Sequence, residues 1–367
     1  MSSKQLLFNR PIPQGWQMLT VDEIKANEPR SCVAGPFGSS ISSKYFVPEG
    51  VPVIRGNNLT DNLTPFVPHG FAFVSEEKAE SFKAQQVKGG DLVFTCWGTL
   101  GQVGLIPYDG PYPTYIISNK QLKLRPNLEI CDPRFLYYYF ASPQMVQHIR
   151  SVAIGAAVPG INLGILKSLQ VVLPPLPIER KIVGVLSAYD DLIENNTRRI
   201  EILEEMARSL YREWFVNFRF PGHEQVKMVD SELGLIPEGW EVKTIGDACL
   251  VGDGAHAKIK RQTSGVLYLT CKNLKEGGLD LSKVDYISEE DYNKYFRDNS
   301  KALTKLKADD VIFSIIGTIG EPYLVKPKDY FGISSSVAIL RRNKSVLYTN
   351  YLYYWVKSHI SRMHYMG

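Results

Sequence analysis

The chain has 367 residues, of which 44% are hydrophobic and 22% charged, and its formal net charge is +4. These values are typical of a folded globular protein, and the length suits two domains of about 150 residues each. The mild positive charge permits a nucleic-acid partner without requiring one.

The sequence shows no sign of secretion or of membrane insertion. The N-terminal residues contain no apolar core followed by a small-residue cleavage site, and no apolar run approaches the roughly 18 residues of a membrane span. The cysteines are odd in number and dispersed, which favours neither a disulfide framework nor a zinc site; they are Cys32, Cys96, Cys131, Cys249 and Cys271. We therefore expect a soluble cytoplasmic protein.

Four segments of the first half recur in the same order in the second half. The pairs are Ile12–Trp16 (IPQGW) with Ile236–Trp240 (IPEGW), Val51–Leu59 with Val266–Leu274, Lys88–Ile106 with Lys307–Val325, and Phe135–Tyr139 with Tyr351–Trp355. Four matches in register indicate the tandem duplication of one domain of roughly 150–170 residues.

Each copy is predicted to be mainly β. A Lys-x-x-Asp turn leads into a short apolar strand, and Gly98–Gly101 (GTLG) and Gly317–Gly320 (GTIG) then turn the chain into the next strand. A phosphate-binding loop is the competing interpretation, but neither copy has the glycine spacing that such loops need. Each copy closes with an aromatic segment, Pro133–Arg150 and Asn350–His364, which we predict to be helical with its tyrosines in the core.

A long helix is predicted between the copies. Pro174–Pro177 (PPLP) favours an extended connector, and the following residues to about Phe218 contain no proline. Apolar residues and one asparagine then alternate at spacings of four and three, at Ile182, Leu186, Tyr189, Ile193, Asn196, Ile200, Leu203, Ala207, Leu210 and Trp214. This seam, and a length of roughly 60 Å, favour a coiled coil over a helix packed on one domain. Asn196 is the type of polar residue that fixes register or partner.

The predicted architecture is α+β, with two tandem β-rich domains of the same fold joined by this helix. The predicted ranges are 1–177 for the first domain, 178–220 for the helix and 221–367 for the second domain. The duplicated domains, the paired Ile-Pro-x-Gly-Trp and Gly-Thr-x-Gly motifs, Gly160–Leu163 (GINL) and Leu173–Leu176 (LPPL) together resemble the specificity (S) subunits of type I restriction–modification enzymes.

The resemblance implies a function and a set of partners. In that family each repeat is a target recognition domain that reads one half of a split DNA sequence, and the helices set the gap between the halves. The subunit is not catalytic and binds no cofactor. It docks modification subunits, which methylate adenine at N6 with S-adenosylmethionine, and restriction subunits, which use ATP and Mg²⁺. The absence of methyltransferase, Walker A and metalloprotease motifs agrees with that role.

The second copy departs from the family in one respect. The counterpart of residues 152–220 is missing from it, and with it the second long helix. We therefore expect either a truncated S subunit or a seam that is covered by another chain, which would be a second copy or a separate half-subunit.

Base recognition needs exposed donors and acceptors, and phosphate contacts need cations. The candidate loops are Gly35–Tyr45 in the first domain and Gly252–Gln262 in the second, which follow the Ile-Pro-x-Gly-Trp motifs at equivalent distances yet differ almost completely. The DNA-binding candidates are Ser39, Ser40, Lys44, Tyr45, Arg55, Asn57, Trp97, His256, Lys258, Lys260, Arg261, Gln262 and Lys272. Asn58 and Asn273 align with each other, so they are as consistent with capping a structural turn as with contacting DNA. Trp97 is likewise as consistent with a position in the core as with a DNA contact.

Two other classes of function compete with DNA recognition. An enzyme with recognition domains attached is disfavoured because its signature motifs are absent. A tandem module that binds protein or carbohydrate on a coiled-coil stalk remains the alternative, and steep salt dependence of DNA affinity distinguishes the two.

Overall fold

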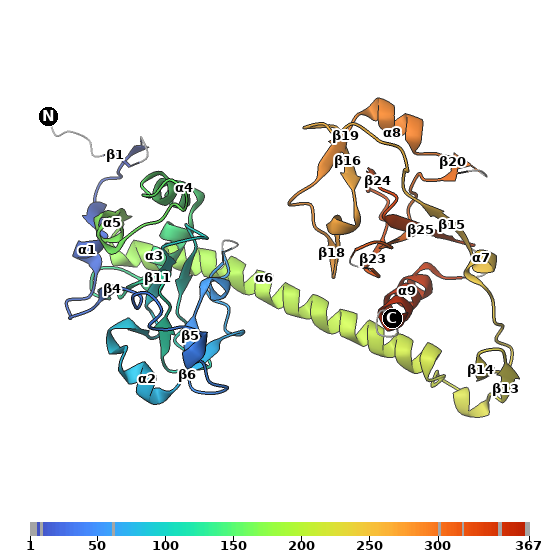
Figure 1. Cartoon of the computed structure of the whole chain (residues 1–367), viewed down its shortest axis with the longest axis horizontal. Helices are drawn as coiled ribbons and strands as arrows, with labels where there is room; N and C mark the ends of the chain where they lie inside the picture. The colour runs from blue at the N-terminus through green and yellow to red at the C-terminus, as the bar shows by residue number, and fades with distance from the viewer. Residues whose placement is uncertain are drawn as a thin grey trace. The chain divides into compact units, whose positions relative to one another are not determined.

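The computed structural model describes residues 6–7, 10–60, 63–299, 302–317, 319–343 and 347–363. The chain divides into two compact units, Met1–Thr197 and Arg198–Gly367, whose boundary lies within one long helix, α6 (Leu176–Tyr211; Figure 1). Each unit combines β-sheets with helices, as predicted for an α+β protein. The units are named the first and the second domain.

Two four-stranded sheets form the first domain. One is antiparallel, in the order β4-β11-β8-β9, and in the other, β6-β5-β10-β7, strands β5 and β10 are parallel. The strands are β4 (Cys32–Ala34), β5 (Val51–Ile54), β6 (Ala72–Val74), β7 (Gln86–Val87), β8 (Leu92–Thr95), β9 (Val103–Leu105), β10 (Tyr115–Ile117) and β11 (Gln121–Leu124). The Gly98–Gly101 turn joins β8 to β9, and φ angles of 87° and 100° at its two glycines explain why glycine is needed there. The turn prediction is confirmed for this copy.

The first aromatic segment is helical, as predicted, and it forms two helices with a break at Ser142. The helices are α3 (Pro133–Ala141) and α4 (Pro143–Ser151). Pro143 lacks the N–H that a continuous helix needs and disfavours a helical conformation at the preceding residue. Ser142 accordingly adopts an extended ψ of 142° and caps α4.

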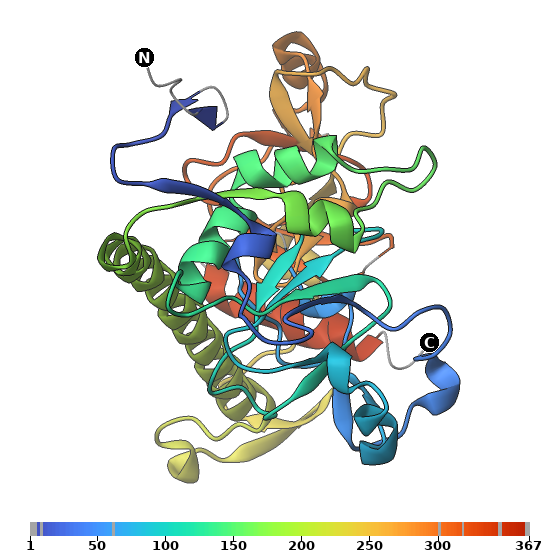
Figure 2. The same cartoon turned by 90° about the vertical axis from the view of Figure 1, so that its left-hand side faces the viewer.

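The aromatic side chains of these helices belong to the core, as predicted. Tyr137 is buried, and the ring of Phe140 meets that of Phe94 in β8 edge-on, with 5.0 Å between their centroids. Figure 2, which faces the first domain, shows α3 and α4 (green) beside its strands. A further helix, α5 (Leu163–Ser168), is followed by β12 (Gln170–Leu173). Strand β12 pairs with β3 (Gln17–Thr20), and α6 begins shortly after it.

The second domain repeats this arrangement. The sheet β15-β25-β22-β23 is the counterpart of β4-β11-β8-β9, and in β19-β16-β24 strands β16 and β24 are parallel, like β5 and β10. The strands are β15 (Cys249–Asp253), β16 (Val266–Leu269), β19 (Asp285–Ile287), β22 (Val311–Ser314), β23 (Pro322–Leu324), β24 (Phe331–Ile333) and β25 (Val337–Arg342). The second predicted aromatic helix is α9 (Thr349–Met363). Thr318 and His364 lie outside the described residues.

Matching polar contacts confirm that the two domains are copies of one fold. In the first domain, both carboxylate oxygens of Asp91 accept hydrogen bonds from the Arg125 guanidinium at 2.7 Å. In the second, Asp310 and Arg341 form the same paired contact at 2.8 Å. Both aspartates also accept the backbone N–H of the lysine that opens the Lys-x-x-Asp turn. The Lys-x-x-Asp motif therefore fixes the start of β8 to the end of β11 in the first domain, and the start of β22 to the end of β25 in the second.

Helix α6 begins earlier and ends earlier than the sequence predicted. It starts at Leu176 because Pro177 falls in the first turn, where proline is tolerated, so only Pro174 and Pro175 remain extended. The regular helix ends at Tyr211, a π-helical turn follows over Arg212–Val216, and Phe218 adopts a left-handed φ of 56°. The helical segment as a whole ends at Val216, close to the predicted end at about Phe218.

The two ends of α6 pack on different domains. Near its start, Val183 is buried in the first domain and the Tyr138 hydroxyl donates to Asp190 (2.6 Å). Near its end, Tyr211 is buried against Tyr351 of α9, with 5.7 Å between ring centroids. Residues 191–200 between them are all exposed.

The predicted seam is therefore largely uncovered in this chain. Ile193 is 65% exposed and Leu203 is 62% exposed, although Ile182 packs on the first domain's core. Many charged residues share the helix with these apolar positions. No helix in the described ranges has a stretch that is long and apolar enough to traverse a lipid bilayer.

Candidate nucleic-acid interface

Three loops of the first domain meet at one end of its two sheets. They are held there by backbone hydrogen bonds from Ser118 N–H to Ile54 O (3.1 Å), from Gly35 N–H to Gln121 O (2.8 Å) and from Cys96 N–H to Lys120 O (2.8 Å). The segments that follow β4, β5 and β8 therefore converge on residues 118–121. These segments carry the predicted DNA-binding residues of the first domain, so the structure brings the first residues of all three loops together.

The second domain has the same convergence. Its hydrogen bonds run from Ser334 N–H to Leu269 O (2.9 Å), from Gly254 N–H to Val337 O (3.1 Å) and from Ile315 N–H to Ser336 O (3.0 Å). The loop after β15 starts here and so does the turn after β16, which carries Lys272. Gln262 does not stay at this end: its N–H donates to Tyr286 O (2.8 Å) in β19. The candidate loop thus runs from the sheet end along β19.

The first-domain loop is pinned at its start and exposes its tip. A Cβ on Gly35 would lie 1.8 Å from the Ser118 carbonyl oxygen, so only glycine fits there. The Asn119 side chain donates to Gly38 O (3.0 Å). Phe37 and Ser39 are exposed at the tip, whereas the Ser40 hydroxyl donates to Phe37 O (2.7 Å) and is engaged within the loop.

A cationic cluster forms where this loop ends. Lys44 and Lys78 hold their ammonium groups 4.6 and 3.9 Å from the centroid of the Tyr45 ring, and Lys78 belongs to α2 (Glu76–Glu80). The hydrogen bond from Lys44 lowers the pKa of the Tyr45 hydroxyl. Arg55 is exposed and donates to Gly70 O at 3.3 Å. Asn57 is also exposed, and its amide lies 3.5 Å from the same oxygen.

The second-domain loop holds its polar groups by different means. The His256 imidazole lies 2.6 Å from a carboxylate oxygen of Asp253. Arg261 donates from Nε to Asp285 (2.8 Å), and its guanidinium lies 4.0 Å from the centroid of the Tyr268 ring. Lys258, Lys260 and Lys272 are exposed. A planar guanidinium fixed in this way keeps free N–H donors for a further acceptor.

Comparison with known proteins finds a family model and several relatives that resemble this chain. A model of the "Type I restriction modification DNA specificity domain" matches residues 37–205, which include the first candidate loop and most of α6. The MjaIX specificity subunit of Methanocaldococcus jannaschii is 26% identical over 281 residues, covering 76% of this chain and 62% of that protein. The putative MjaX specificity subunit of the same organism is 24% identical over 327 residues, covering 87% and 72%. The chain is therefore similar to the specificity subunits of type I restriction–modification systems, and residues 37–205 match their DNA specificity domain.

A solved structure shares the fold. The S subunit of a type I restriction–modification system from M. genitalium shares 15% identity with this chain and superposes with a TM-score of 0.53, over 98% of this chain and 81% of that one. The chain spans 62% of the length of its MjaIX relative.

Sequence reasoning missed the residues at the centre of each sheet end. In the first domain these are Asn119 and Lys120, which are exposed between β10 and β11. The signal was present, because Tyr115–Gln121 (YIISNKQ) aligns with Phe331–Val337 (FGISSSV) at the same spacing as the paired aromatic segments. Both segments link the parallel strand of one sheet to the central strand of the other.

Two candidates have structural roles. Asn58 is buried and accepts Arg55 N–H (3.0 Å) while its amide donates to Val67 O and His69 O. Asn273 makes the equivalent three bonds in the second domain, so capping of a turn is confirmed for both. Trp97 is 38% exposed, and a Cβ on Gly160 would lie 2.3 Å from its ring. One face of the Trp97 ring therefore packs against Gly160.

The described residues contain no cluster of three or more His, Cys, Asp or Glu side chains that could hold a metal ion. The described cysteines are free thiols, and burial raises the pKa of Cys32 and Cys96 to about 11. These thiols are therefore protonated at neutral pH and are poor nucleophiles.

Proposed function

We propose that this chain is the sequence-specific DNA recognition subunit of a type I restriction–modification complex. Each domain reads one half of a bipartite target, and α6 sets the spacing between the halves and docks modification subunits. The chain itself is not catalytic and binds no cofactor. S-adenosylmethionine, ATP and Mg²⁺ act in the modification and restriction subunits with which it assembles.

One observation carries this proposal: two copies of one scaffold present unlike loops at equivalent places. The scaffold contacts are the same in both domains, as the Asp91–Arg125 and Asp310–Arg341 pairs illustrate. The loops that follow β4 and β15 share almost no residues, and their polar groups are held by different partners. Two readers of different half-sites need a common frame and different contact surfaces.

The chemistry of the loops suits the grooves of duplex DNA. Exposed lysines and arginines bind phosphates or guanine, and asparagine and glutamine bind adenine. In the second domain, Lys258 and Lys260 are exposed on the candidate loop, and Lys272 is exposed at the sheet end from which that loop starts. We propose phosphate or base contacts for these residues. Arg261, held by Asp285 and Tyr268, is proposed to contact guanine.

The decisive experiment maps methylated adenines in cells that carry this chain with its modification subunits. The unmodified chain should direct methylation to a two-part sequence. Arg261→Ala should relax or abolish recognition of one half only, because that residue belongs to one domain. Arg55→Ala in the first domain is the matched variant, and it should affect the other half. Each lost base contact should weaken binding by about 1–3 kcal/mol.

A binding measurement separates this function from a non-DNA interaction module. Affinity for the mapped sequence should fall steeply as salt increases, because phosphate contacts release counterions. Binding without sequence preference, even in the presence of the modification subunits, would contradict the proposal. So would an Arg261→Ala variant that changes both half-sites equally.

We also propose that the exposed seam of α6 pairs with a second long helix, supplied by another copy of this chain or by a separate half-subunit. The support is the exposure of Ile193 and Leu203 at seam positions. Replacing both with glutamate should abolish association in analytical ultracentrifugation at micromolar concentration while both domains stay folded. Arg198→Glu with Glu205→Lys, at exposed positions outside the seam, is the control. This pairing is contradicted if the unmodified chain is a monomer by itself and also stays a monomer when the half-subunit is added.

A further inference from the structure

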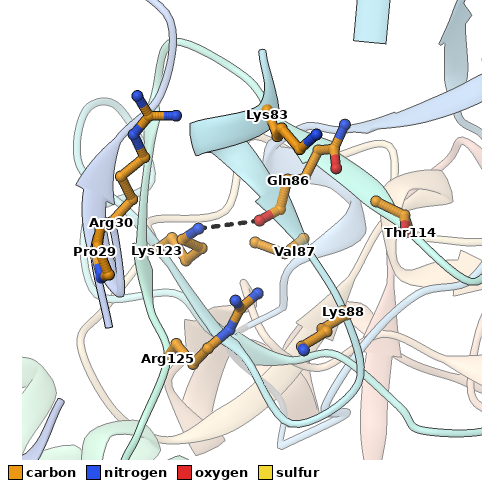
Figure 3. A pocket seen from close by; sticks show the side chains of 9 residues that line it. All are labelled: Pro29, Arg30, Lys83, Gln86, Val87, Lys88, Thr114, Lys123 and Arg125. Carbon is orange, nitrogen blue, oxygen red and sulfur yellow. Dashed lines mark hydrogen bonds between the residues drawn. The ribbon is translucent and has the colours of Figure 1, made fainter. Parts of the chain in front are cut away.

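A cationic cavity lies in the first domain, at the end of β11 opposite to the candidate DNA interface. Its volume is about 410 Å³. Arg30, which precedes β4, is on one wall, and the segment from Lys83 to Lys88 is on the other, with Lys123 and Arg125 of the β11 region between them (Figure 3). The lining residues are Pro29, Arg30, Lys83, Gln86, Val87, Lys88, Thr114, Lys123 and Arg125.

The cavity has more positive charge than its neighbours neutralise. Arg125 is paired with Asp91 and Glu28, both at 2.7 Å, and Lys83 is paired with Glu80. The remaining cations are Arg30, Lys88 and Lys123, and none of them forms an ion pair with a carboxylate in the described ranges. Unbalanced cations of this kind attract an anion to the space between them.

Lys123 is the unusual member of the group, because its side chain is inside the protein. It is 2% exposed, and its ammonium donates to the backbone oxygens of Ala84 (2.8 Å) and Gln86 (3.1 Å). An ammonium has three donors, so one is left, and the two carbonyl partners carry no net charge. Burying a charge without a counter-charge is costly. The cavity is the place where the missing negative charge would complete this site.

The second domain shows that the fold does not need this lysine. Lys123 pairs with Val93 across β11 and β8, and the equivalent pair across β25 and β22 is Ile339 with Ile312. Ile339 is fully buried in an apolar cluster. Both domains keep the arginine two residues further on with its aspartate partner. A buried isoleucine therefore serves the scaffold, and the lysine is particular to the first domain.

We propose that this cavity binds a phosphate group, with Lys123, Lys88 and Arg30 as its cationic partners. Phosphate suits the site because its several oxygens can accept bonds from several cations at once, and because it carries more than one negative charge near neutral pH. The Thr114 hydroxyl and the Gln86 amide also line the cavity and are available for neutral hydrogen bonds. The site is independent of whether the loops at the other sheet end read DNA.

Titration calorimetry of the full chain with inorganic phosphate, at constant ionic strength set with chloride, tests the proposal. The unmodified chain should bind phosphate in a saturable manner. Lys123→Met, which keeps the length of the buried side chain, should bind at least about ten-fold more weakly. Lys328→Met removes an exposed lysine of the second domain, outside the cavity and the candidate loops, and should leave phosphate affinity unchanged. Arg30→Ala and Lys88→Ala change exposed positions and should each weaken binding, which keeps the test valid if Lys123→Met does not fold.

Proton uptake provides a second readout. Burial, and then the charge of Arg125, lower the pKa of Lys123 to about 8, against the opposing effects of Asp91, Glu28 and Cys32. A bound phosphate would favour the charged ammonium, so binding at pH 8 should take up protons from the buffer, and Lys123→Met should abolish that uptake. Condensation of phosphate on surface lysines would show no dependence on Lys123.

The source of the phosphate is distinguished with non-specific duplex DNA. If the site takes a backbone phosphate, Lys123→Met should lower DNA affinity and free phosphate should compete with DNA. If it takes a free phosphate or a small phosphate ester, DNA affinity should be unchanged while phosphate binding is lost. Both results support the site. Absence of saturable phosphate binding at millimolar concentration, or equal phosphate affinity in Lys123→Met and the unmodified chain, overturns it.

Discussion

Glu179→Gln should make the first domain more stable at alkaline pH. Glu179 lies in the first turn of α6 and is completely buried. One carboxylate oxygen accepts the backbone N–H of Asp132 at 2.7 Å, and the other has no hydrogen-bond partner within the described part of the chain. Asp132 in turn caps α3. The glutamate thus links the start of α6 to the start of α3 through a buried carboxylate.

The magnitude follows from the pKa of this carboxyl. Burial raises the pKa of Glu179 to about 7 from its ordinary 4.5, with a further rise from the Asp132 carboxylate, although the Asp132 N–H and Arg180 act in the opposite direction. The folded chain therefore binds this proton more tightly than the unfolded chain. Stability from this group is full below pH 4.5 and is lost as pH rises towards 7. The shift corresponds to about 3 kcal/mol of unfolding free energy.

The assay is urea unfolding at several pH values between 4.5 and 8, followed by a pulse of a dipyridyl disulfide, a reagent that labels an accessible Cys131 at acidic as well as neutral pH. This thiol is completely buried beside Asp132, so its labelling reports the opening of the first domain alone. The unfolding free energy of Glu179→Gln, minus that of the unmodified chain, should rise by up to about 3 kcal/mol across this range. Glu194→Gln, at an exposed position of the same helix, controls for the loss of one negative charge. A difference that does not change with pH, or that falls, refutes the reasoning.

Two further substitutions test the turns that position the loops. Asn58→Ala removes three hydrogen bonds from a buried turn and should lower the unfolding free energy of the first domain by about 2–4 kcal/mol. Asn273→Ala should lower the unfolding free energy of the second domain only, by a similar amount. Hydrogen exchange measured separately for each domain checks both expectations. Gly35→Ala places a Cβ 1.8 Å from the Ser118 carbonyl oxygen, so it should displace the first candidate loop and weaken DNA binding. Gly38→Ala should have a smaller effect on DNA binding, because the space around its Cβ is open although its φ is 60°. Equal DNA affinities for Gly35→Ala and the unmodified chain would contradict the role assigned to Gly35.

Local sequence patterns determined most of the fold. The repeated motifs revealed the duplication because each encodes a contact that both domains need, such as the Asp91–Arg125 pair and the turn capped by Asn58. The seam of α6 was visible because a helix places every third or fourth residue on one face. The sequence did not predict the two ends of α6 to the residue, since Pro177 is tolerated in a first turn and the left-handed backbone at Phe218 leaves no clear signature in the sequence.

The tertiary structure alone decided which distant residues share a surface or a cavity. The loops after β4, β5 and β8 meet only because parallel β5 and β10 and antiparallel β11 and β8 end together, and nothing local in the sequence states that pairing. Lys123 looks like an ordinary strand lysine until its neighbours bury it, and Glu179 looks like an exposed helical glutamate until α6 packs on the first domain. A residue's charge and hydrogen-bonding state depend on what surrounds it, and those surroundings come from segments far away in the chain.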